Sequence, residues 1–86
     1  MSYKINQGFI TQKIENKLTI FEGEESLLHT LNKTAAYIFQ GLKLGWEDKQ
    51  ITIGLIKMGA TQGEAEKDLK DFIQLLLKKG IIIEAG

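Results

Sequence analysis

Apolar and polar residues alternate along the first third of the chain and recur at helical spacing along the rest. Phe9 to Ile14 and Leu18 to Glu22 are short runs rich in Phe, Ile and Thr, and the polar residues between them tolerate a turn. Leu27 to Leu31 is a third run of this kind after a second polar turn. The pattern predicts a three-stranded antiparallel meander with Leu27 to Leu31 at its edge.

Two helices are predicted over the middle of the chain, the first capped by Asn32 and the second by Asp48. The apolar positions expected on one face of the first helix are Ala35, Ile38, Phe39 and Leu42. Those of the second helix are Ile51, Leu55, Ile56 and Met58. Gly45 and Gly59 are expected to end the two helices, because glycine readily adopts the left-handed conformation found at helix C-termini.

A third helix has the clearest start, because Thr61 and Glu64 have the spacing of a capping box, and Gly80 is expected to end it. Its predicted core positions are Ala65, Leu69, Phe72, Ile73 and Leu76. On a helical projection Leu75 lies on one flank of this stripe and Leu77 on the other. The Leu75 flank also carries Asp68 and Lys79, and the Leu77 flank carries Glu66 and Lys70.

Three strands followed by three helices indicate a single α+β domain spanning residues 1–86. In such an order the helices are expected to pack against one face of the antiparallel sheet. Ile81 to Ile83 fits either a short final strand or an apolar tail folded onto the core, and the sequence leaves both open.

Composition argues against several classes of function. Eleven Lys balance eleven Asp and Glu, and there is no Arg, so neither a net positive field nor bidentate phosphate contacts would draw the chain to nucleic acid. His29 is the only imidazole and Cys is absent, so no partnered nucleophile and no metal site is indicated. We therefore expect no catalysis, no cofactor and no metal.

The sequence leaves two interpretations open for each of His29 and Trp46, and its N-terminal segment bears on the location of the protein. His29 is either a packed, hydrogen-bonded side chain or part of a peptide-binding wall, and Trp46 is either a lid on the core or a ligand platform. The chain has neither a signal-peptide pattern at its start nor an apolar stretch long enough to cross a bilayer. A cytoplasmic location without membrane attachment is the expectation.

The junction between the third strand and the first helix resembles a known family. The segment from Leu31 to Phe39 reads Leu-Asn-x-Thr-Ala-Ala-x-Ile-Phe, which is similar to the PqqD-like family, named for pyrroloquinoline quinone biosynthesis protein D. The positions that extend the likeness are Asp68, Leu69, Phe72, Leu76, Gly80, Ile81 and Ile82, so that it covers roughly residues 9 to 84. The usual Asp-Gly between the first two helices is replaced by Leu44-Gly45-Trp46, which argues against the quinone-cofactor branch itself.

The resemblance implies a winged-helix-like fold and a non-catalytic peptide chaperone, also called a RiPP recognition element. Such a protein binds the leader segment of a ribosomally made precursor peptide and presents it to a modifying enzyme, such as a radical or ATP-dependent maturase. The leader would add as a strand to the edge strand, beside the last helix. The residues expected to bind it are Leu27, Leu28, His29, Thr30, Leu31, Asp68, Phe72, Leu75 and Lys79.

Two alternatives stay open. The strand and helix order also permits a winged-helix nucleic-acid-binding module, although the last helix carries as many acidic as basic residues. The third class is a structural docking subunit that uses the edge strand or the triple Ile without peptide cargo. A monomer or a weak dimer is expected in either case.

Overall fold

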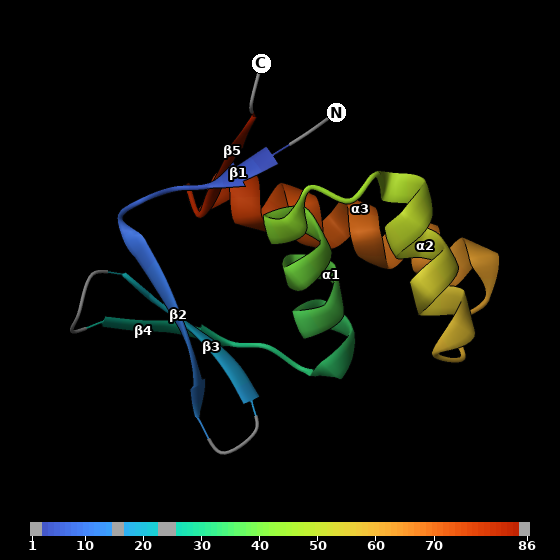
Figure 1. Ribbon diagram of the computed structural model, residues 1–86, viewed down its shortest axis with the longest axis horizontal. Coiled ribbons are helices and arrows are strands. Elements are labelled where there is room, and N and C mark those ends of the chain that lie inside the picture. Colours follow the sequence, from blue (N-terminus) through green and yellow to red (C-terminus); the bar gives the residue numbers. More distant parts are fainter. Residues whose placement is uncertain (1–2, 15–16, 23–25, 85–86) are drawn as a thin grey trace.

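The chain combines a three-stranded sheet, three helices and a two-stranded ribbon that joins its two ends (Figure 1). The structure, a computed structural model, describes residues 3–14, 17–22 and 26–84, with the backbone alone described within 22–30. The elements are β1 (Tyr3–Ile5), β2 (Phe9–Ile14), β3 (Lys17–Glu22), β4 (Ser26–Thr30), α1 (Lys33–Leu44), α2 (Asp48–Lys57), α3 (Gln62–Lys78) and β5 (Ile82–Glu84). The predicted α+β class is confirmed.

The three-stranded sheet has the order β2-β3-β4, with both pairs antiparallel, as the alternating pattern predicts. Among the described residues β4 pairs with β3 alone, so it lies at the edge of the sheet. The register shifts between Ile20, opposite His29, and Phe21, opposite Leu27. Leu28 is therefore an extra residue, a β-bulge, and the strict alternation assumed from Leu27 to Leu31 does not hold.

The two-stranded ribbon was not predicted. β1 pairs antiparallel with β5, with Ile5 opposite Ile82, and the two strands lie side by side in Figure 1. Asn6 extends the pairing, because its backbone N–H donates to the Ile81 carbonyl at 2.8 Å and its side-chain amide donates to the Gly80 carbonyl at 2.9 Å. The triple Ile therefore continues as a strand rather than as an unpaired tail.

The helix termini follow the predicted capping residues at α1 and α3. The Asn32 side chain accepts a hydrogen bond from the Ala35 N–H at 2.8 Å. The Thr61 hydroxyl accepts from the Glu64 N–H at 3.2 Å, and the Glu64 carboxylate accepts from the Thr61 N–H at 3.0 Å. Both caps satisfy backbone donors that the first helical turn leaves unpaired.

The predicted cap of the second helix is wrong by one residue. Glu47 is the N-cap of α2, with extended backbone, and Asp48 is the first helical residue. The Gln50 side chain reaches back and accepts a hydrogen bond from the Glu47 N–H at 2.9 Å. Gln50 thus supplies one half of a capping box. The negative charge of Asp48, in the first turn, interacts favourably with the positive end of the helix dipole.

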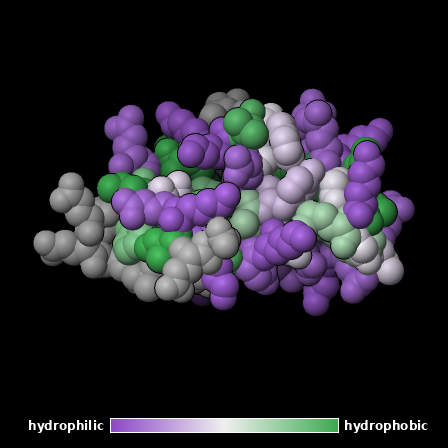
Figure 2. Space-filling view, turned by 60° about the horizontal axis from the view of Figure 1, so that its bottom comes forward, coloured by the Kyte–Doolittle hydropathy of each residue, from purple (hydrophilic) through white to green (hydrophobic). Residues whose placement is uncertain are grey.

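The core lies where α3 meets α1 and α2, with Ile20 of the sheet and Ile82 of β5 closing it. All five predicted core positions of α3 are buried. Two residues of the predicted α2 face, Ile56 and Met58, are instead 39% and 42% exposed. Ile51 and Leu55 of the same face are buried in the core, and the other two lie outside it. On the face shown in Figure 2, hydrophilic side chains surround smaller hydrophobic areas.

Trp46 follows the C-terminus of α1, where Gly45 has a left-handed φ of 81°. Its ring packs against Tyr37 at a centroid distance of 5.5 Å and an interplanar angle of 57°. The side chain is half-buried against the core, which supports the interpretation of Trp46 as a lid on the core.

Candidate functional site

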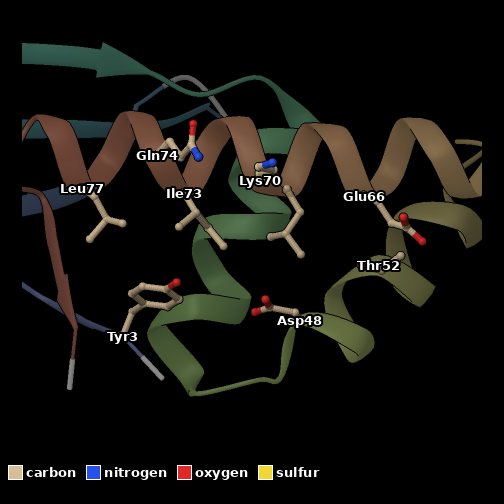
Figure 3. A pocket seen from close by; sticks show the side chains of 9 residues that line it. Tyr3, Asp48, Thr52, Glu66, Lys70, Ile73, Gln74 and Leu77 are labelled. Atoms are coloured by element: carbon tan, nitrogen blue, oxygen red, sulfur yellow. The ribbon is translucent and has the colours of Figure 1, made fainter. Parts of the chain in front are cut away.

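Two grooves run along opposite flanks of α3. The first, here the α1–α3 groove, has a volume of about 360 Å³ and is lined by Asn32, Thr34, Ala35, Ile38, Asp68, Asp71, Phe72 and Leu75. The second, here the α2–α3 groove, has a volume of about 420 Å³ and is lined by Tyr3, Asp48, Thr52, Glu66, Leu69, Lys70, Ile73, Gln74 and Leu77 (Figure 3). The grooves separate Asp68 and Leu75 from Glu66, Lys70 and Leu77, as the helical projection predicted, but Lys79 is not in the lining of the α1–α3 groove.

The α1–α3 groove begins where the edge strand ends. β4 runs to Thr30, which lies opposite Thr19, and the next residue, Leu31, donates its N–H to the Leu18 carbonyl at 2.8 Å. Asn32 then caps α1 and lines the groove. The groove therefore begins two residues beyond the end of β4, at the cap of α1.

The α1–α3 groove has an apolar floor and an acidic rim. Ile38 and Phe72 are buried beneath it, and Leu75 is half-buried and open to it. Asp68 and Asp71 are exposed and lie one helical turn apart on the same side of α3, and none of the described residues that line the groove is a Lys. An apolar side chain could sit on this floor, and the rim would attract a neighbouring positive charge.

The structure brings together three of the predicted binding residues: Asp68, Phe72 and Leu75. Lys79 is the C-cap of α3 and does not line the groove. Leu31 is 2% exposed, so its side chain belongs to the core rather than to a binding surface. The side chains of Leu27, Leu28, His29 and Thr30 lie outside the described part, which gives only their backbone pairing.

Sequence reasoning missed the wall that α1 contributes to this groove. Thr34, Ala35 and Ile38 line it, although the last two were assigned to the core alone. Asp71 was also missed as a groove residue, yet it follows Asp68 by three positions, a spacing that places both on one side of a helix. That spacing was available in the sequence.

The α2–α3 groove places a tyrosine beside a carboxylate. In Figure 3 the Tyr3 hydroxyl points toward Asp48, while Ile73 and Leu77 of α3 project into the space above the ring. Burial, and then the negative charges of Asp48 and Glu84, raise the pKa of the Tyr3 hydroxyl above its ordinary value of 10.0. The Tyr3 hydroxyl therefore keeps its proton to a higher pH than an isolated tyrosine.

Among the side chains that the structure describes, those of residues 3–14, 17–21 and 31–84, no three His, Cys, Asp or Glu form a group that could hold a metal ion. Over the same ranges, no helix has the length and apolar character needed to cross a membrane.

Two solved structures have the same fold as this chain. One is a lasso peptide synthetase B1 complexed with the leader peptide, at 19% identity and a TM-score of 0.87, covering 98% of this chain and 100% of that one. The other is TbiB1 in complex with the TbiA(beta) leader peptide, at 18% identity and a TM-score of 0.81, covering 96% and 98%. The fold that the PqqD-like resemblance implied is thus confirmed.

Sequence comparison adds one partial relative. A hydroxylamine reductase from Trichormus variabilis is 35% identical over 72 residues, which is 84% of this chain but 13% of the relative. The chain therefore spans only a small part of that protein, and its activity does not carry over. No family model matches the sequence.

Proposed function

We propose that this chain, which has the fold of the two leader-bound structures, is a non-catalytic PqqD-like protein that binds the leader segment of a precursor peptide. It presents that peptide to a modifying enzyme. The observation that carries the proposal is the placement of the α1–α3 groove, which begins at Asn32, two residues beyond the end of the edge strand β4. The two solved structures described above are complexes with a leader peptide, which supports the same role here.

Strand addition to β4 supplies generic affinity. About four hydrogen bonds at ~0.5 to 1.5 kcal/mol each would offset the ~2 to 5 kcal/mol needed to order the peptide, so that backbone pairing alone roughly breaks even. Micromolar binding corresponds to about 8 kcal/mol. The remainder must come from side chains of the leader that bury apolar surface.

The α1–α3 groove supplies the anchor point for such a side chain. Phe72 and Ile38 form a preformed apolar floor, and Leu75 offers additional apolar surface at the rim. Fully burying one aliphatic or aromatic side chain contributes about 1.5 to 3 kcal/mol. With backbone pairing at break-even, two such anchors would contribute about 3 to 6 kcal/mol, so micromolar binding requires at least three.

The rim adds selectivity by charge. Asp68 and Asp71 would favour a leader with Lys or Arg next to its apolar anchor, and an exposed pair of this kind contributes about 0.2 to 1 kcal/mol. The same carboxylates oppose a polyanion. A nucleic-acid-binding module is therefore the weaker interpretation of this surface.

Hydrogen exchange tests the mode of binding. The leader of a short open reading frame next to a peptide-modifying enzyme is added to the full chain, and exchange of individual amides is followed. We expect slower exchange for outward amides of β4, because they gain hydrogen bonds to the added strand. Leader binding without slower exchange in β4 would contradict strand addition. The proposed role would be contradicted if the gene for this chain had neither a peptide-modifying enzyme nor a short open reading frame beside it.

A further inference from the structure

β2 forms the second edge of the three-stranded sheet, on the side away from β4. Among the described residues it pairs with β3 alone, so the main-chain groups along its outer side have no strand partner there. Its register with β3 is unbroken from Phe9 to Ile14, whereas β4 contains a bulge. Six consecutive residues of β2 therefore have the regular extended geometry that a further strand needs.

The two faces of β2 differ in what covers them. Ile20 of β3, which lies opposite Thr11, is fully buried, so Thr11 lies on the core side of the sheet. Ile10, Gln12 and Ile14 alternate with Thr11 and lie on the other side. Ile10 and Ile14 are 39% and 46% exposed. Two exposed isoleucines thus lie four residues apart on one face of an edge strand.

This spacing is self-complementary. When two β2 strands pair antiparallel about a two-fold axis at Gln12, each Ile10 lies opposite the Ile14 of the other copy. Side chains directly opposite each other have Cβ atoms about 4.5 to 5.5 Å apart, so both isoleucine pairs are in contact. Pairing about a point between Thr11 and Gln12 would instead set Ile10 opposite Lys13. The register centred on Gln12 is the one that pairs every exposed isoleucine of β2 with an isoleucine.

Charge does not oppose this pairing. Lys13 is the only charged residue of β2, and in this register it lies opposite Thr11 of the other copy rather than opposite a second Lys13. Eleven Lys balance eleven Asp and Glu over the whole chain, so two copies do not repel each other through their net charge. Proteins with a net charge near zero associate more readily than strongly charged ones.

We propose that β2 is the contact between two copies of this chain, which join their sheets edge to edge. The strand order across the dimer is β4-β3-β2 of one copy followed by β2-β3-β4 of the other. A second copy is the partner that fits, because the isoleucines of the edge match their own spacing. Six residues span about 20 Å, which makes a small interface. The dimer is therefore weak, with a dissociation constant of about 10 μM to 1 mM.

The dimer does not depend on the proposed function, because β2 and β4 are opposite edges of the sheet. It gives that function a consequence. Both β4 edges remain free at the two ends of the joined sheets. One dimer can therefore hold two leader peptides at the same time.

Sedimentation equilibrium of the full chain without added peptide tests the contact, after circular dichroism has shown that each variant is folded. From about 10 μM to about 1 mM the apparent mass should rise from that of one chain towards that of two. Ile10→Lys and Ile14→Glu should each weaken the association at least about tenfold, because either sets a charge against an isoleucine in both pairs. Ile53→Lys, at a 45% exposed position on α2, is the control and should leave the association unchanged.

A double variant tests the register. Ile10→Lys combined with Ile14→Glu sets a Lys opposite a Glu in both pairs, so it should associate at least about threefold more tightly than either single variant. A double variant no tighter than the single ones would overturn the proposed contact. So would an unmodified chain that stays a monomer at about 1 mM, or single variants that associate as it does.

Amide exchange gives a readout that needs no substitution. Amides of β2 in the unmodified chain should exchange more slowly at about 1 mM than at about 10 μM, and amides of β4 should exchange equally at both concentrations. Concentration-dependent slowing in β4, or in neither strand, would overturn the β2 contact, and so would a leader peptide that slows exchange in β2. A leader that does not bind at all would contradict the proposed function and leave the dimer standing.

Discussion

Gly54 of α2 lies so close to Tyr37 of α1 that a Cβ at position 54 would overlap the hydroxyl and the ring of that tyrosine. The two helices therefore meet at a point where only glycine fits. The Tyr37 ring in turn contacts Trp46, so the closure of the α1–α2 corner depends on this approach.

Gly54→Ala is expected to destabilise the protein even though alanine favours helix formation. The added methyl group must displace Tyr37, and overpacking of this kind costs about 1 to 3 kcal/mol. Gly63→Ala is the control, because nothing lies within 4 Å of a Cβ at Gly63 in α3. The control should raise the free energy of unfolding by about 0.4 to 1 kcal/mol. Urea denaturation gives the free energy of unfolding of both variants. An equal change in the two would contradict the close contact between Gly54 and Tyr37.

Ile82 and Ile83 test the unpredicted β1–β5 ribbon. Ile82 is 1% exposed and belongs to the core, whereas Ile83, its neighbour in β5, is 41% exposed. Ile82→Ala should lower the free energy of unfolding by about 2 to 5 kcal/mol. Ile83→Ala should change it by less than about 0.5 kcal/mol. If the segment were an unpaired tail, the two variants would unfold at similar urea concentrations.

The capping box of α3 should make stability depend on acid pH. Hydrogen bonds from the Thr61 backbone N–H and then its hydroxyl hold the pKa of the Glu64 carboxyl below its ordinary value of 4.5. A carboxyl with a lowered pKa in the folded state contributes stability above its ordinary value, and this is lost as pH falls through the folded pKa. As the pH is lowered from about 4.5, the melting temperature of the unmodified chain should therefore fall more than that of Glu64→Gln. Parallel curves for the two proteins would exclude this role of Glu64.

The helical part of the fold was largely predictable because its signals are local. Asn32 and Thr61 cap their helices through contacts with residues three positions away, and the stripe of α3 follows from its period alone. The cap of α2 was misplaced because Glu47 and Asp48 are both plausible at a helix start. The Gln50 side chain decides between them, since it accepts from the Glu47 N–H.

The remaining features depend on contacts between distant segments. β1 has three residues, too few for a pattern, and it is a strand because Ile5 pairs with Ile82 near the other end of the chain. Ile56 matched the helical period but is 39% exposed, because it lines an open hollow between α2 and α3 and lies outside the core that Ile51 and Leu55 enter. The α1 wall of the α1–α3 groove likewise follows from how α1 crosses α3.

The central claim is that the leader anchors on the Leu75 flank of α3, and two leucines on opposite flanks test it directly. Leu75 lines the α1–α3 groove and Leu77 lines the α2–α3 groove, and both are half-buried, so their replacement by Glu is matched in chemistry and burial.

Titration calorimetry of the full chain with the leader peptide gives the answer, after circular dichroism has shown that both variants are folded. Leu75→Glu should weaken binding by about tenfold or more, because it removes apolar surface worth at least ~1.5 kcal/mol from the anchor site. Leu77→Glu should bind like the unmodified chain. Unchanged affinity in Leu75→Glu together with weakened binding in Leu77→Glu would place the leader on the other flank and contradict the account.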